Sequence, residues 1–410
     1  MRRQDARAAW AGATLVLCLL LAALVSLTTS QSGDYALHGP LDGDNAAPAI
    51  DALVHARLGA FFSHQPVMGL TSLLLRAPCA WMAGRLGAGE LTIYGVGTLV
   101  CLGGLAWLGG MIVSRSRPGR DRVVAALAAL FLVANPLTSS AITIGHPEEV
   151  LAIALASAAV LAASAGHLRS AGLMLGLAIG CKPWALLAFP VVLLVSRDRR
   201  LIVAVIALVV AIPLAVVAPL VDLKAFGEAT RAIGGGRLAD PFSVWWAVGE
   251  HVVRSSGTAA TSARQLPFGL TRTDAMVSGG LLVALGLVAV MRDRLRDLRL
   301  IDGLALLALL CLVRCVLDPE PLEYNFIVVL VPLLVWELQA RGGVPIFAVA
   351  FALFASLLYG GRLHLPTIGV NALSILSDLG LGALLVLGLT RRGVRRPSRV
   401  STMPAAAPTS

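Results

Sequence analysis

Long apolar runs separated by short, basic segments dominate the sequence. Predominantly apolar stretches of about 20 residues recur along the chain, which is the length that an α-helix needs to cross about 30 Å of hydrocarbon. A closed β-barrel would instead show short segments of alternating polarity. The pattern therefore predicts an all-α fold, a polytopic bundle of transmembrane helices.

The apolar runs can be assigned to individual spans. The first run could pass for a signal peptide, but many further runs follow it, so we expect an uncleaved first helix. The expected spans lie at about residues 9–29, 92–113, 123–140, 148–165, 201–221, 273–291, 300–317, 323–339, 344–360 and 367–390, and the segment 170–195 is ambiguous.

The basic clusters resolve that ambiguity, because short loops rich in Lys and Arg stay in the cytoplasm. The clusters fall at residues 115–122, 197–200, 292–299, 341 and 391–399. A single crossing by 170–195 would put the second and third clusters outside. A break at Lys182-Pro183 gives two short halves and returns every cluster to the cytoplasm, and proline supplies the physical reason for a break. We therefore predict about twelve crossings of the cell membrane, with both termini cytoplasmic.

Composition and charge agree with a membrane solvent. The chain is 57% hydrophobic and only 14% charged, with a mean hydropathy of +0.83, more apolar surface than a soluble domain could hide. The net charge of +10 comes from arginine clusters between apolar runs, so we expect membrane lipids as partners and no nucleic acid. No metal-ligand set, phosphate-binding loop or dinucleotide motif is present in the sequence, so we expect no metal and no cofactor.

Four polar segments open on the outer side in this topology, and the first is the loop 30–90. Carboxylates gather there directly after the first span, and the segment Asp-Gly-Asp-Asn at 42–45 is also ordinary turn chemistry. Alternatively, one carboxylate is a general base near the membrane surface. The candidates in this loop are Asp34, Asp42, Asp44, Asp51 and His64. Residues 50–62 predict an interfacial helix, and 66–83 a shallow or re-entrant one.

The next two segments flank the fourth span and the predicted break. His146, Glu148 and Glu149 open the span at 148, where acidic side chains either cap the helix or form a polar site at the membrane boundary. Lys182 and Trp184 lie at the break. A lysine in apolar surroundings needs an anion, a carboxylate partner or a route to the interface.

The last segment begins the span at 323. It contains Asp318, Tyr324 and Asn325, preceded by Arg314. Arg314 is one helical turn from Asp318, so the two form either an ion pair or part of a site. The long loop 222–272 lies on the same side as these segments. Its Trp245 and Trp246 either anchor the loop at the membrane interface or form a surface on which a sugar stacks.

The order of these motifs resembles the GT-C superfamily of membrane glycosyltransferases, and most of all glycosyltransferase family 87. The similarity is carried by the acidic first loop, Asn135-Pro136, Gly145-His-Pro-Glu148, the run Gly172-Leu-Met-Leu-Gly-Leu-Ala-Ile-Gly-Cys-Lys182-Pro-Trp184, and Asp318-Pro with Tyr324. The resemblance implies transfer of mannose from a polyprenyl-phosphate donor to a lipid or glycan acceptor on the outer face of the membrane, with a first-loop aspartate as base. It favours Asp44 in that role, with Asp42, Asp34 and Asp51 as rivals.

A lipid-linked donor brings its own phosphate leaving group, so the protein must supply cations for the phosphate and a base for the acceptor hydroxyl. Lys182 and Arg314 are candidates for the first task. The rival class is a transporter or flippase for a lipid-linked or anionic substrate, since broken helices and intramembrane charge also mark transporters; the large acidic loop and the lack of a clear repeat favour the enzyme. We expect one membrane domain over 1–397 and a disordered tail over 398–410.

Overall fold

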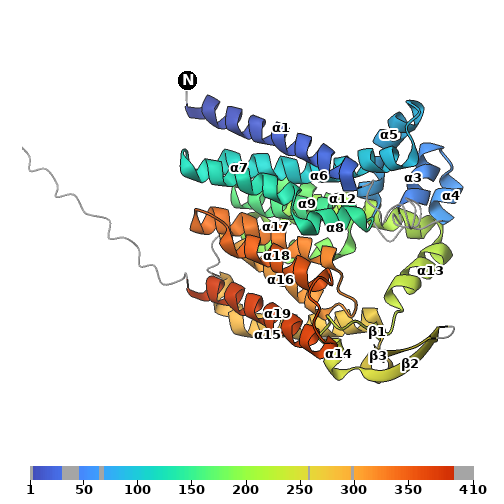
Figure 1. Ribbon diagram of the computed structural model, residues 1–410. Helices are drawn as coiled ribbons and strands as arrows, with labels where there is room; N and C mark the ends of the chain where they lie inside the picture. Colours follow the sequence, from blue (N-terminus) through green and yellow to red (C-terminus); the bar gives the residue numbers. More distant parts are fainter. Residues whose placement is uncertain (1–2, 30–45, 64–68, 257–258, 297–299, 392–410) are drawn as a thin grey trace, which may run out of the picture.

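The computed structural model describes residues 3–29, 46–63, 69–256, 259–296 and 300–391 of the chain, and most of them are helical (Figure 1). The all-α, polytopic prediction is confirmed. The helices are α1 (Arg3–Thr29), α3 (Ala47–Val54), α4 (Leu58–Ser63), α5 (Leu70–Arg85), α6 (Glu90–Arg115), α7 (Arg120–Val133), α8 (Pro136–Thr143), α9 (Pro147–Ser164), α10 (Leu168–Cys181), α11 (Ala188–Ser196), α12 (Arg200–Val221), α13 (Leu223–Gly234), α14 (Trp245–Val248), α15 (Arg272–Arg296), α16 (Gly303–Leu317), α17 (Ile327–Trp336), α18 (Ile346–Tyr359) and α19 (Thr367–Arg391).

Length and apolar composition identify the candidate membrane-crossing helices. Within the described residues, seven helical segments are long and apolar enough to span a membrane: Asp5–Thr28, Thr92–Arg115, Arg120–Thr143, Pro147–Ser164, Arg200–Val221, Glu323–Arg341 and Thr367–Thr390. Shorter apolar helices lie at Leu168–Cys181, Pro183–Ser196, Gly303–Leu317 and Ile346–Tyr359. Each predicted span falls on helical structure, but the one predicted at 123–140 is divided between α7 and α8 at Ala134 and Asn135. The count of about twelve crossings stays a prediction.

The predicted break at Lys182-Pro183 is confirmed. α10 ends at Cys181, Lys182 has extended backbone angles (φ −146°, ψ 131°), and a 3₁₀ turn (Pro183–Leu187) leads into α11. Proline has no N–H to continue the α10 hydrogen-bond ladder, and it disfavours a helical residue before it.

The packing of α10 against α12 shows that the chain reverses at this break. Glycines on α10 meet side chains on α12 in the pairs Gly172 with Ile206, Gly176 with Val210, and Gly180 with Leu214. Each step of four residues along α10 is matched by a step of four along α12, so the two helices are parallel. α11 must therefore return the chain between them, which places residues 197–200 at the end of the bundle opposite Lys182.

The α10 glycines allow this close approach, and among them Gly176 has the shortest approach to the α12 backbone. A Cβ added at Gly176 would lie 2.6 Å from Val210 Cβ and 2.7 Å from the carbonyl oxygen of Ala207. Gly176→Leu should therefore destabilise the protein by about 1–3 kcal/mol, the usual cost of overpacking. Thermal unfolding in detergent measures this. Gly286→Leu, at an exposed position where a Cβ would meet nothing within 4 Å, is the matched control and should unfold with the wild type; equal melting of the two variants would contradict the packing argument.

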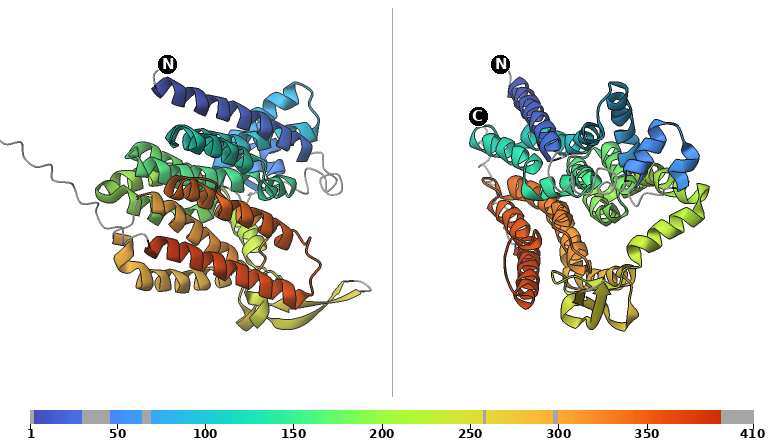
Figure 2. Two further views of the ribbon diagram at one scale, coloured as in Figure 1. Left: turned by 60° about the vertical axis from the view of Figure 1, so that its left-hand side comes forward. Right: turned by 45° about the vertical axis from the view of Figure 1, so that its right-hand side comes forward.

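The short helices and the strands gather at one end of the bundle. α3, α4, α5, α13 and the sheet lie together at the right of Figure 1, and the two further views agree (Figure 2). The interfacial segment predicted at 50–62 is two short helices, separated where Ala56 has a positive φ of 53°. The helix predicted within 66–83 is α5, and whether it is shallow or re-entrant stays a prediction. The structure also contains a small antiparallel sheet that was not predicted. Its strands are β1 (Leu238–Ala239), β2 (Glu250–Ser256) and β3 (Ala259–Gln265), and β3 lies between the other two.

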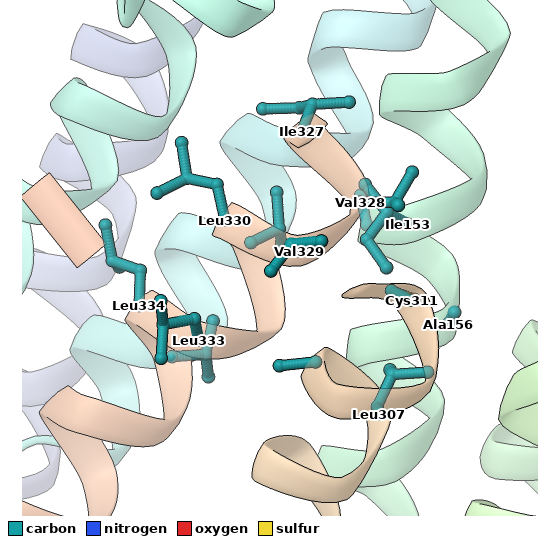
Figure 3. Packing of buried hydrophobic residues seen from close by; sticks show 14 of the residues in the cluster. Ile153, Ala156, Leu307, Cys311, Ile327, Val328, Val329, Leu330, Leu333 and Leu334 are labelled. Carbon is teal, nitrogen blue, oxygen red and sulfur yellow. The ribbon is translucent and has the colours of Figure 1, made fainter. Parts of the chain in front are cut away.

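α9 is the central helix of the bundle. Its apolar segment is 89% buried, whereas those of α12 and α1 are only 17% and 22% buried and face outward. Figure 3 shows the core beside it, where Ile153 of α9 packs near Cys311 of α16 and Val328 of α17. Polar side chains at the start of α9 are therefore buried in protein and depend on protein partners.

Candidate functional site

A buried cluster of charged and aromatic side chains lies at the start of α9. It combines His146, Glu148 and Glu149 with side chains from the α10–α11 break, the end of α16 and the 3₁₀ turn Glu323–Phe326 before α17: Lys182, Trp184, Arg314 and Tyr324. We call these seven residues the ion cluster. Three of the four predicted outer segments thus meet in space.

Glu148 and Lys182 form the centre of the ion cluster. Lys182 Nζ lies 2.9 Å from Glu148 Oε1, and His146 Nδ1 lies 3.1 Å from the same oxygen. Glu148 is completely buried and Lys182 is 8% exposed. Because each charge has an opposite charge in contact, the pair can persist away from water. Carboxylate partners therefore satisfy Lys182.

Glu149 connects the rest of the ion cluster. Its Oε2 accepts a hydrogen bond of 2.6 Å from the indole Nε1 of Trp184, and its Oε1 lies 3.3 Å from Lys182 Nζ and 3.9 Å from Arg314 Nη2. The Arg314 guanidinium also lies over the Trp184 ring, 5.4 Å from its centroid, within cation–π range. Tyr324 stacks on His146 with ring centroids 4.6 Å apart.

Two atoms of the ion cluster have hydrogen-bonding capacity left over. Within the described part of the chain, Glu148 Oε2 and Arg314 Nη1 are buried and have no hydrogen-bond partner. Leaving such atoms unsatisfied costs about 1–3 kcal/mol each, and more for charged groups. The ion cluster therefore offers one buried acceptor and one buried donor to a polar ligand.

Asp318 is paired with a residue that the sequence did not single out. Arg272, at the start of α15, donates from Nε to Asp318 Oδ1 at 2.8 Å and from Nη2 to Oδ2 at 2.7 Å, and its Nη1 lies 3.4 Å from Glu320. Of the two alternatives for Arg314, the ion pair with Asp318 is therefore wrong. Arg314 turns instead toward Glu149, because the two-pronged contact with Arg272 occupies both Asp318 oxygens.

Asn325 is buried beside the ion cluster residue Tyr324.

The long loop holds this segment in place. Trp245 Nε1 donates to the Leu317 carbonyl at 2.9 Å, Ser243 Oγ donates to the Asp318 carbonyl at 3.0 Å, and the Asp240 amide donates to the Pro319 carbonyl at 2.8 Å. Burial raises the pKa of the Asp240 carboxyl above its ordinary value. Trp245 therefore anchors the loop to the end of α16.

The first-loop candidates are only partly described. Asp34, Asp42, Asp44 and His64 lie outside the described residues. Asp51 lies on the surface of α3, where its half-exposed side chain pairs with His55 and Arg57, and it has no contact with the ion cluster.

The helix that follows this loop docks directly on the break. The amide of Gly69, the N-cap of α5, donates to the Cys181 carbonyl at 2.9 Å. A Cβ at Gly69 would lie 2.0 Å from the Gly180 carbonyl oxygen, so only glycine permits this approach. α3 packs on α5 through Ala49, Ile50 and Leu73. The described parts of the first loop therefore lie at the same end of the bundle as Lys182.

The fold and the ion cluster together define a polytopic membrane protein with a buried polar site at one end of its helices. The family description "Glycosyltransferase family 87" matches residues 69–319, which is more than half of the chain, and the chain belongs to that family. No curated protein and no solved structure matches it. The matched region begins at the N-cap of α5 and ends just after Asp318, so it contains most of the ion cluster.

Proposed function

We propose that this glycosyltransferase moves a sugar, mannose by its family resemblance, from a polyprenyl-phosphate donor to a lipid or glycan acceptor of the cell envelope. The reaction takes place at the end of the bundle that holds the ion cluster, which the positive-inside rule assigns to the extracytoplasmic face. The observation that carries the proposal is that Arg314 Nη1, a buried donor, and Glu148 Oε2, a buried acceptor, have no hydrogen-bond partner among the described residues. Both atoms lie in the region that matches the glycosyltransferase family.

The donor phosphate needs a cation that is not already neutralised. Lys182 has two carboxylates within 3.3 Å, and Arg272 is held in two contacts by Asp318. Arg314 makes only a long contact of 3.9 Å with Glu149 and keeps Nη1 unpartnered within the described residues. We therefore assign Arg314 to the phosphate, and Glu149 and Trp184 to holding its guanidinium group in place.

The acceptor hydroxyl needs a base, and Asp44 is our assignment. Asp44 precedes the first residue of α3, Ala47, by three positions in the sequence. α3 in turn packs on α5, whose N-cap bonds to the α10–α11 break. This connection supports an aspartate close to the ion cluster. Glu148 Oε2 has no hydrogen-bond partner among the residues that the structure describes, so it is suited to accept a hydrogen bond from a sugar hydroxyl.

A direct assay tests the function. Purified full-length protein with radiolabelled polyprenyl-phosphate mannose and an envelope lipid extract should produce a labelled glycolipid or glycan. Labelled polyprenyl-phosphate glucose measures sugar selectivity in parallel. Movement of intact donor across a liposome membrane without any transfer would instead establish the transporter or flippase reading.

Arg314→Gln should weaken donor use selectively. Losing a charge-assisted hydrogen bond costs about 1.5–3 kcal/mol, so we expect KM for the polyprenyl-phosphate donor to rise roughly 10–100-fold. Initial rates at varied donor concentration measure this. Arg362→Gln, at an exposed arginine, is the control. A KM equal to that of the wild type would remove Arg314 from the phosphate site.

A further inference from the structure

A polar cavity lies at the opposite end of the bundle from the ion cluster. α6 begins at the ion-cluster end, where Tyr94 OH donates to the Ile142 carbonyl at 2.6 Å, and ends at Arg115. α17 likewise runs away from Tyr324 and continues into the π-helical turn Glu337–Arg341. The ends of these two helices and the loops that follow them line a partly open cavity of about 160 Å³, and we call it the basic cavity.

Positive charge exceeds negative charge around the basic cavity. Its walls carry Arg115, Arg117 and Arg341 against the single acid Asp121. Arg341 is already paired, because its Nη1 lies 3.2 Å from Glu337 Oε1. Arg115 and Arg117 are therefore the cations that remain for a bound anion.

Arg115 supplies the second observation. Its Nη1 atom is buried without a hydrogen-bond partner in the part of the chain that the structure describes. A guanidinium nitrogen hidden from water and left unsatisfied is costly. A ligand with acceptor oxygens in the cavity would remove that cost, since guanidinium groups bind phosphate with charge-assisted hydrogen bonds.

The backbone keeps one side of the basic cavity open. Gly342 and Gly343 line it with positive φ angles of 72° and 80°, and a Cβ at either position would meet nothing within 4 Å. Residues with a Cβ rarely adopt this backbone conformation. Gln339 adds a neutral amide donor to the same wall, whereas the Ser116 hydroxyl already donates to the Ile112 carbonyl at 2.9 Å.

We propose that the basic cavity binds a phosphate group, either of an anionic lipid headgroup or of a soluble phosphate. Its volume is several times the roughly 30 Å³ that one water occupies in the liquid, enough for one phosphate group. It lies at the bundle end to which the arginine clusters assign the cytoplasm, where basic pockets between helices bind anionic headgroups. This site is separate from the sugar-transfer site, and it holds whether or not the proposed donor is correct.

Lipid retention and thermal unfolding test the proposal on the purified full chain. Native mass spectrometry with phosphatidylglycerol or phosphatidylcholine measures retention, and unfolding with and without inorganic phosphate measures binding of the free anion. We expect at least about tenfold preferential retention of phosphatidylglycerol, and its loss in Arg115→Gln, from the loss of a charge-assisted contact. Arg199→Gln is the control, at an exposed arginine of the turn before α12, at the same end of the bundle.

The arms separate the two sources of phosphate. Retained phosphatidylglycerol in the presence of excess inorganic phosphate identifies a lipid headgroup, and stabilisation by inorganic phosphate without lipid preference identifies the soluble anion. Arg117→Gln, at an exposed position, repeats the test if Arg115→Gln does not fold. The proposal is overturned if the wild type shows neither effect, or if both folded variants bind like the wild type.

Discussion

Asp44→Asn should lower the rate of sugar transfer by about a thousandfold, within the usual contribution of a general base. Asparagine keeps the size and the hydrogen-bonding shape of aspartate but cannot take the proton from the acceptor hydroxyl. The loss should therefore appear in kcat, with little change in KM for the donor. Thermal unfolding and the yield of protein in the membrane should match the wild type, because only the charge of one side chain changes.

Three neighbouring aspartates provide matched controls for this experiment. Asp51→Asn removes an exposed ion pair with Arg57 and His55, which is worth at most about 1 kcal/mol, and it should leave transfer unchanged. Asp34→Asn and Asp42→Asn test the rival positions in the same loop. A large loss in one of them alone would move the base to that residue, and normal transfer in all four variants would remove the aspartate mechanism.

The arrangement of helices could be predicted because the membrane imposes strong rules. Apolar length predicted each span, and the distribution of arginine predicted that 170–195 must break, at the place where Pro183 cannot continue a helix. The parallel packing of α10 and α12, seen in the contacts of Gly172 and Gly176, confirms the reversal that this break implies. Both signals are local, so one sequence was sufficient.

The ion cluster was predicted as residues but not as pairs. The position of Lys182 in an apolar stretch indicated that it needs an anionic partner. In the structure that partner is Glu148, which lies 34 positions earlier in the sequence. Arg272 was not predicted as a site residue, because its partner Asp318 is 46 positions away in the sequence. In addition, an arginine at the boundary of a span is usually interpreted as an orientation signal. Sequence spacing offered Arg314 as one possible partner of Asp318, whereas in the fold Arg272 contacts both Asp318 oxygens.

The sheet in the long loop left little pattern to detect. Its longer strands, Glu250–Ser256 and Ala259–Gln265, contain few of the β-branched and aromatic residues that mark strands, and charged residues interrupt them. The prediction of a single interfacial helix at 50–62 was wrong for a different reason. Its helical periodicity is correct, but the segment forms two helices, α3 and α4. The positive φ of Ala56 divides it, and no glycine, asparagine or proline marks that position.

Lys182→Met should destabilise the protein by about 3–5 kcal/mol, the cost of removing one partner from a buried ion pair. Methionine fills much of the space of the lysine stem but carries no charge. Glu148, which is fully buried, would then keep only His146 nearby, and Glu149 would keep Trp184 and its long contact with Arg314. Thermal and denaturant unfolding in detergent measure the loss, and Lys224→Met, at an exposed lysine of α13, should unfold like the wild type.

A second substitution separates the loss of a charge from the loss of packing. Glu148→Gln in the Lys182→Met background removes the carboxylate that has lost its partner, so the double variant should regain most of the lost stability, because neutral groups of similar shape can replace a buried ion pair with little loss. Transfer activity should stay low, since the unpartnered oxygen of Glu148 no longer carries charge for the substrate. Equal stability of the wild type and Lys182→Met, or no recovery in the double variant, would show that the lysine and the glutamate do not depend on each other, and the site would then need another organising centre.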